Sequence, residues 1–210
     1  MIEAFCGAFL SMLARVVTGV RVVWRGSMPD LRPRIYFANH RSHADFVLLW
    51  TALPAPLRRL TRPVAGADYW LQSRLRSFMA ERVFHAVLID RRPGAKDVDP
   101  IATMAAALDL QQSLIIFPEG TRNTGDNLLL PFKSGLYYLA RSRPGVECVP
   151  VWIENLNRVM PKGEFVPIPL LCTVTVGAPI TVAGDEEKDV FLERCRQALL
   201  ALAAPHRGES

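Results

Sequence analysis

The sequence lacks the patterns that commonly hold metals or nucleotides. Its four cysteines (Cys6, Cys148, Cys172 and Cys195) lie far apart, with no Cys-x-x-Cys pair and no histidine at zinc-finger spacing. This predicts a reducing compartment and no structural zinc. A Walker loop and a G-x-G-x-x-G segment are both missing, so nucleotide binding has no support. A G-x-S-x-G segment is missing as well, so the sequence shows no convincing nucleophile of its own.

Long hydrophobic runs are also missing. Residues 4–14 are apolar and uncharged, but as a helix they span only about 16 Å, against about 30 Å for a bilayer core. A secretory signal fits poorly, because the only charge ahead of the run is Glu3. We therefore predict that residues 1–17 form a helix in the membrane interface. A second apolar run, at 46–57, is followed by three arginines and is compatible with either core packing or membrane contact.

Charge is unevenly distributed along the 210 residues, half of which are hydrophobic. Disorder is excluded by that apolar content. Residues 1–96 hold 15 basic and 6 acidic side chains, while residues 97–210 hold 10 and 14. Arginine makes up 21 of the 25 basic residues, which suits an anionic partner. A GC-rich genome explains an arginine excess equally well, but it does not explain the asymmetry between the halves.

Short apolar runs alternate with longer helical patterns along the chain. This βαβα order predicts a single α/β domain over residues 1–210, with a mostly parallel sheet flanked by helices. The expected strands lie at 19–24, 34–40, 58–66, 84–90, 113–117, 146–153 and 171–177. The expected helices, after the two apolar runs, lie at 69–83, 100–111, 134–142 and 186–203.

Polar clusters follow three of the predicted strands. The strand at 34–40 ends in His40 and continues to Asp45, the strand at 84–90 continues into Arg91, and the strand at 113–117 continues into the segment 118–122. Ligands of open α/β sheets bind beyond the carboxyl ends of the strands. The shared position of these clusters therefore predicts one site.

His40 and Asp45 have the chemistry of a general base and its orienting carboxylate. They can meet if the residues between them form a turn from strand end to helix start. With no nucleophile in the protein, the attacking group would be a substrate hydroxyl. Two other interpretations remain: a metal site of His40, His43 and Asp45, which lacks a fourth ligand, and a structural histidine beside an Asp45 helix cap.

The segment at 117–122 combines an acid, a glycine and an arginine. Arg122 and loop amides suit one phosphate group, with Glu119 accepting from a hydroxyl and Gly120 allowing close approach of the backbone. The alternative is an ordinary Pro-Gly turn with an exposed charge pair.

These residues resemble the motifs of the glycerol-phosphate and lysophosphatidate acyltransferases, a membrane-associated family. The first motif, Asn-His followed by four residues and Asp, is similar to residues 39–45, and the third, Phe-Pro-Glu-Gly-Thr-Arg, is present in full at 117–122. Residues 87–91, 132–135 and 149–151 are similar to the remaining family segments. The motifs fall within residues 34–153.

The resemblance implies that His40 is the base and Asp45 its partner. It places the glycerol-phosphate group among Arg91, Glu119, Gly120 and Arg122, with Lys133 a weaker candidate. Asp90 departs from the commonest second-motif pattern. The implied substrates are a lysophospholipid acceptor and an acyl thioester, either acyl-CoA or acyl-carrier protein, with no metal or other cofactor and no nucleic acid. The implied location is the cytoplasmic face of the cell membrane.

The expected reaction is acylation of the free hydroxyl of 1-acyl-glycerol-3-phosphate to give phosphatidic acid. The alternatives are acylation of another lysophospholipid, a non-catalytic lipid-binding protein of the membrane, and a metal-dependent phosphoesterase.

Overall fold

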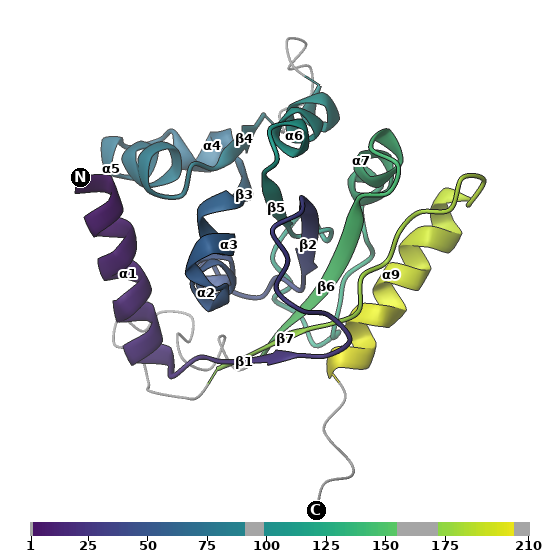
Figure 1. The fold of residues 1–210 in the computed structure, drawn as a ribbon, viewed down its shortest axis with the longest axis horizontal. Coiled ribbons are helices and arrows are strands. Elements are labelled where there is room, and N and C mark those ends of the chain that lie inside the picture. Colours follow the sequence, from purple (N-terminus) through teal and green to yellow (C-terminus); the bar gives the residue numbers. More distant parts are fainter. Residues whose placement is uncertain (1, 91–98, 155–171, 204–210) are drawn as a thin grey trace, which may run out of the picture.

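A seven-stranded sheet forms the centre of the protein in a computed structural model, which describes residues 2–90, 99–154 and 172–203 (Figure 1). The strand order is β1-β7-β6-β2-β5-β3-β4, and every neighbouring pair is parallel except β6 and β7. The strands are β1 Arg21–Trp24, β2 Arg34–Ala38, β3 Thr61–Gly66, β4 Val87–Ile89, β5 Ser113–Ile116, β6 Glu147–Glu154 and β7 Thr173–Val176.

Helices cover both faces of the sheet (Figure 1). They are α1 Ile2–Thr18, α2 Asp45–Ala52, α3 Ala55–Leu60, α4 Ala67–Trp70, α5 Arg74–Phe78, the π-helical turn η1 Met79–Val83, α6 Pro100–Asp109, α7 Gly135–Ser142 and α9 Lys188–Ala203. The prediction of a mostly parallel sheet flanked by helices is confirmed.

The central strand β2 shows why both faces are covered. Its residues are all buried, and side chains alternate across a strand. Tyr36 and Ala38 pack into the core that includes α2, whereas Ile35 and Phe37 pack into the core that includes α6, α7 and α9. A strand buried on both faces requires a continuous apolar run, which is what this segment has.

The apolar run at 46–57 forms part of the core. It is divided between α2 and α3 by Leu53 and Pro54, where the chain is extended. Leu49 and Leu57 are almost completely buried. Of the two interpretations left open for this run, the structure supports core packing.

The expected helix at 69–83 is interrupted. Ser73 adopts an extended backbone conformation and its side chain accepts a hydrogen bond from the Arg76 amide, so that a new helix starts there. The chain then continues through the π-helical turn η1. Local capping therefore overrides the continuous amphipathic pattern.

Helix α1 lies beside α2 (Figure 1). Leu10 and Val17 pack against the core, while Met12 and Val16 on the same helix are exposed. Within the described ranges, no helix combines the length and the hydrophobicity needed to cross a membrane. The helix at the N-terminus is therefore present, with one apolar face packed and another exposed.

Candidate active site

The turn between β2 and α2 brings His40 and Asp45 together. Strand β2 ends at Ala38 and helix α2 begins at Asp45, so a short turn separates the two residues. His40 Nδ1 lies 2.9 Å from Asp45 Oδ2. Asp45 is buried, whereas the His40 side chain keeps 20% of its surface exposed. The pair thus has one buried member and one that solvent or substrate can reach.

Asp45 fixes which nitrogen of His40 carries the proton. The same Oδ2 atom accepts hydrogen bonds from the backbone amides of Arg41 and Ser42, each at 2.7 Å. An ionised carboxylate only accepts hydrogen bonds. Nδ1 of a neutral His40 must therefore donate, which leaves the lone pair on Nε2.

The loop after β5 holds the main chain of His40. The His40 amide donates to Glu119 Oε1 at 2.8 Å, and the His40 carbonyl accepts from the Asn123 amide at 2.7 Å. The imidazole also stacks on Phe117, with ring centroids 4.2 Å apart. Strands β2 and β5 are parallel neighbours, so their carboxyl ends meet at the same edge. The residues that follow β2 and β5 therefore lie together at this edge.

Glu119 is a buried carboxylate that joins two loops. Its Oε2 atom accepts from the Leu130 amide at 2.8 Å, so both oxygens receive a backbone hydrogen bond. Burial raises the pKa of Glu119, and the two amides together with nearby His40 and Arg41 act in the opposite direction. This positioning of the His40 backbone is not apparent from the sequence. A contact between Glu119 and a substrate stays a prediction.

Gly120 and Lys133 come into close contact beside this carboxylate. Gly120 has φ +70°, and a Cβ atom there would lie 3.1 Å from Lys133 Cγ. The Lys133 amide donates to the Pro118 carbonyl at 2.7 Å. Glycine therefore relieves both backbone strain and crowding by the lysine stem.

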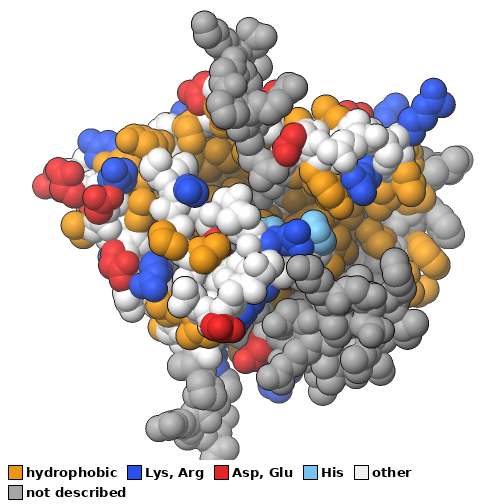
Figure 2. Space-filling view, turned by 180° about the vertical axis from the view of Figure 1, so that it is seen from behind, with side chains coloured by type: hydrophobic (Ala, Val, Ile, Leu, Met, Phe, Trp, Pro, Cys, Tyr) orange, Lys and Arg blue, Asp and Glu red, His pale blue; other side chains and the backbone are white. Residues whose placement is uncertain are grey.

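Two basic side chains near the site have no acidic partner among the residues that the structure describes. The described parts of the chain provide no ion pair to Arg122 or to Lys133, both of which are exposed. Figure 2 shows histidine and basic side chains together in a depression on one face, with hydrophobic side chains exposed next to it. Arg91 lies outside the described residues. Strand β4, which precedes it, is separated from β5 by β3.

Two asparagines contribute to the site in ways the sequence analysis missed. Asn39 is buried, and its side chain donates to the Ile153 carbonyl at 2.9 Å and accepts from the Ile153 amide at 2.8 Å. Asn123 donates from its side chain to the Asn127 carbonyl at 2.7 Å. A polar residue directly after the apolar strand was a signal for Asn39. Asn123 lies in a polar loop and offered no such signal.

His43 does not lie with His40 and Asp45 as a metal-binding group. Its ring stacks on Tyr69, with centroids 5.7 Å apart and planes inclined by 14°. Partial burial lowers the pKa of His43, and Arg122 is the next largest cause. Among the side chains that the structure describes, no group of three or more His, Cys, Asp or Glu is arranged to hold a metal ion.

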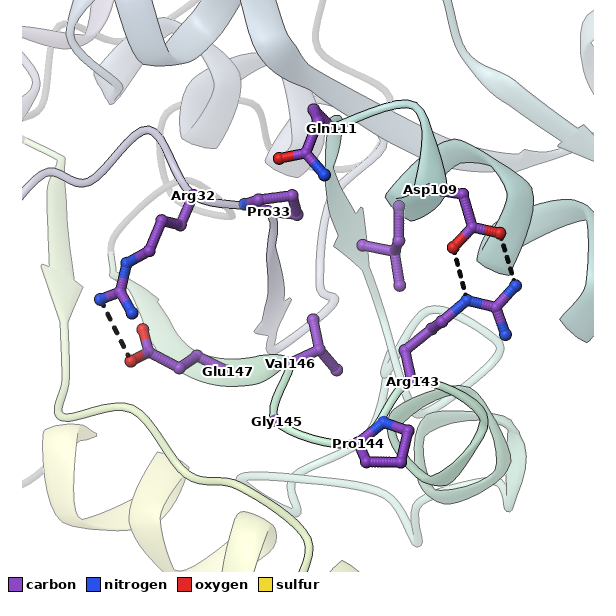
Figure 3. Close-up of a pocket in the computed structure, with 10 residues that line it drawn as sticks. Arg32, Pro33, Asp109, Gln111, Arg143, Pro144, Gly145, Val146 and Glu147 are labelled. Atoms are coloured by element: carbon purple, nitrogen blue, oxygen red, sulfur yellow. Dashed lines mark hydrogen bonds and ion pairs between the residues drawn. The ribbon is translucent and has the colours of Figure 1, made fainter.

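A separate pocket of about 490 Å³ lies at the opposite end of the strands (Figure 3). It is lined by residues just before β2, β5 and β6. Its arginines are already paired: Arg143 donates to both carboxylate oxygens of Asp109 at 2.6 Å, and Arg32 contacts Asp30 at 2.6 Å. This pocket therefore has little unpaired charge for an anionic ligand.

Comparison with known proteins identifies the family. The sequence profile described as Acyltransferase matches residues 19–154. The chain belongs to this acyltransferase family. Mouse 1-acyl-sn-glycerol-3-phosphate acyltransferase alpha is 28% identical over 205 residues, covering 92% of this chain and 67% of the relative. The Salmonella typhimurium 1-acyl-sn-glycerol-3-phosphate acyltransferase is 33% identical over 130 residues, covering 59% of this chain and 47% of the relative.

A solved structure of the same architecture exists. The crystal structure of the 1-acyl-sn-glycerophosphate acyltransferase PlsC from Thermotoga maritima superimposes with a TM-score of 0.73 at 20% sequence identity. The match covers 99% of this chain and 83% of PlsC. The chain therefore shares the fold of PlsC. The curated relatives are longer than this chain, which spans between 47% and 67% of the two named above.

Replacing Glu119 tests its contacts with the His40 and Leu130 amides. In Glu119→Gln, one of the two backbone amides faces an NH₂ group instead of an oxygen, so a buried donor loses its partner. We expect a loss of about 2–3 kcal/mol in the free energy of unfolding, equivalent to a drop in Tm of about 2–4 °C per kcal/mol for a chain of this size. Thermal unfolding by circular dichroism measures it.

The matched control is Glu187→Gln, because Glu187 is exposed and directly precedes helix α9. Its Tm should stay within about 1–2 °C of wild type.

The raised pKa of Glu119 means that the native state holds this proton at a higher pH than the unfolded chain does. Stability from this group therefore falls as pH rises above its ordinary value of 4.5, and Glu119→Gln should lack that slope. Equal Tm values for the two variants would contradict the assigned role.

Proposed function

We propose that this acyltransferase moves a fatty acyl group from an acyl thioester to the free hydroxyl of 1-acyl-glycerol-3-phosphate, giving phosphatidic acid. The observation that carries the proposal is the His40–Asp45 contact of 2.9 Å. Asp45 also accepts hydrogen bonds from two backbone amides. This arrangement directs the basic Nε2 of His40 away from the carboxylate. The names of the related proteins support the same acceptor.

The proposed reaction needs no nucleophile from the protein. His40 Nε2 takes the hydroxyl proton of the acceptor as its oxygen attacks the thioester carbonyl. The tetrahedral intermediate then collapses, the carbon–sulfur bond breaks, and the thiolate leaves as a thiol with the proton held by His40. Asp45 stabilises the imidazolium in between. Acyl-CoA and acyl-carrier protein both provide such a thioester.

The acceptor phosphate fits the unpaired cations of the loop after β5. Arg122 offers a planar fork of donors and Lys133 a point charge, and Gly120 opens the backbone next to Lys133. We include Arg91 in the proposed site on the strength of the sequence resemblance alone. Glu119 contributes by positioning His40 and is proposed to lie near the acceptor.

We also propose that helix α1 rests on the membrane surface, on the cytoplasmic face where we expect the thioester donor. One face of α1 exposes large apolar side chains, namely Phe9, Met12, Leu13 and Val16, each between 44% and 74% exposed. A buried helix would hide them, so a lipid interface is the environment that suits this face.

Three arginines, Arg15, Arg58 and Arg59, lie on α1 and on α3. Arg15 and Arg58 both donate to the carbonyl of Thr51, at 2.9 and 3.4 Å. Burial lowers the pKa of Arg58, and the neighbouring Arg15 and Arg59 lower it further. Across the described ranges, no carboxylate forms an ion pair with these three arginines. Such a cluster is suited to anionic lipid headgroups.

The catalytic proposal is tested with purified protein, radiolabelled acyl thioester and 1-acyl-glycerol-3-phosphate. Wild type should form phosphatidic acid, and His40→Ala should lower the rate about 10²–10⁴-fold because the general base is gone. The unfolding transition of the variant should match that of wild type. Absence of diacyl product with every donor and acceptor contradicts the function, and an undiminished rate in His40→Ala contradicts the mechanism.

The membrane proposal is tested by flotation with vesicles that contain phosphatidylglycerol. Binding should weaken as salt rises, because exposed charges are screened. The double variant Arg15→Gln, Arg59→Gln should bind about 10- to 30-fold more weakly at low salt, at about 1 kcal/mol per arginine. Arg196→Gln on α9, across the molecule (Figure 1), is the matched control. Vesicle binding that is unchanged by salt and by the double substitution would contradict this assignment.

A further inference from the structure

Helix α4 contributes an aromatic ring to the edge of the active site. Tyr69 stacks on His43 with ring centroids 5.7 Å apart, and His43 is three residues from His40 in the same turn. The adjacent Trp70 packs edge-on against Phe46 at 5.5 Å, which fixes α4 against the start of α2. The segment after β3 is thus packed directly on the turn that carries the His40–Asp45 pair.

Arg76 continues this stack from helix α5. Its guanidinium carbon lies 4.4 Å from the centroid of the Tyr69 ring, a cation–π geometry. Its Nη1 atom donates to Gln72 Oε1 at 3.2 Å. Arg76 is partly buried. The guanidinium is therefore held at a fixed place and still has most of its five donors available.

Arg74 provides a comparison within the same helix. Arg74 is exposed, and within the described part of the chain it makes no stacking contact, hydrogen bond or ion pair. Two arginines of one short helix thus differ: one is packed toward the active site and one points to solvent. Arg76 therefore differs from Arg74 in its contact with Tyr69, although both residues are basic and lie on the same helix.

Positive charge from several side chains acts on His43. Partial burial lowers the pKa of His43, and Arg122, His40 and Arg76 lower it further, while Asp45 acts in the opposite direction. Asp45 already accepts three hydrogen bonds and Glu119 two. Within the described residues, Arg76 and Arg122 have no ion pair.

We propose that Arg76, held on the Tyr69–His43 stack, is a phosphate-binding residue of the substrate site and acts together with Arg122. The ligand class is the phosphate group of a substrate. Arg76 comes from the helices after β3, whereas Arg122 comes from the loop after β5, so the anion would join two segments that are far apart in sequence. This inference rests on the proposed acyl transfer, because it assigns Arg76 to the substrates of that reaction.

Binding is measured first, without turnover. Glycerol 3-phosphate is added to the full chain while the His43 imidazole is followed by NMR. A bound phosphate should raise the His43 pKa in wild type and in the control Arg74→Gln, because it offsets the positive charge nearby. In Arg76→Gln this shift should be absent or need at least tenfold more ligand. Identical titrations of Arg76→Gln and Arg74→Gln would overturn the proposal.

Kinetics then identify which substrate carries the phosphate. Arg76→Gln should raise a KM about 10- to 100-fold, as expected for the loss of a charge-assisted hydrogen bond, with kcat within about threefold. A higher KM for 1-acyl-glycerol-3-phosphate assigns the phosphate to the acceptor, and a higher KM for the thioester assigns it to the donor. Unchanged KM values for both substrates would overturn the proposal.

The Tyr69 ring and the phosphate site are tested separately from turnover. Tyr69→Leu removes the ring and leaves the guanidinium, so its KM should lie between those of wild type and Arg76→Gln. A KM equal to that of wild type would overturn the positioning role of the stack. If wild type forms no product but Arg76 still controls the phosphate-induced shift of His43, the phosphate site stands and the proposed acyl transfer fails.

Discussion

The hydrogen bond from the His40 amide to the Glu119 carboxylate, 2.8 Å long, joins the ends of two neighbouring parallel strands. Because β2 and β5 lie side by side, the residues after each strand must share a small volume. Glu119 and Asn123 bind the two sides of the His40 backbone, and Phe117 packs on its ring. The orientation of the imidazole is thus set by main-chain contacts as well as by Asp45.

This arrangement separates the charges of the site. The carboxylates of Asp45 and Glu119 are buried, and both accept hydrogen bonds from backbone amides of the protein. The basic groups of Arg122 and Lys133 are exposed and unpaired among the described residues. A site of this kind attracts an anionic substrate toward the edge of the sheet that carries His40. The buried acids position His40, and the exposed cations are available for the phosphate of the proposed acceptor.

Much of this could be predicted from the sequence because strand ends are easy to locate. The apolar run before Asn39 and the run before Pro118 identified β2 and β5, and the five-residue spacing of His40 and Asp45 required a turn. Backbone partners could not be predicted in this way, since any amide can bind Glu119. The core position of residues 46–57 likewise depends on packing between distant segments, which local hydrophobicity does not determine. Residues 91–98 are outside the described structure, so the place of Arg91 stays a prediction.

The central claim is that Asp45 holds the proton of neutral His40 on Nδ1 and leaves Nε2 as the base. The most direct test is the tautomer of His40, measured from the ¹⁵N chemical shifts of its imidazole in the full chain. The account predicts a protonated Nδ1 and an unprotonated Nε2 in wild type, with this preference lost in Asp45→Ala. A neutral His40 in wild type that carries its proton on Nε2 would contradict it.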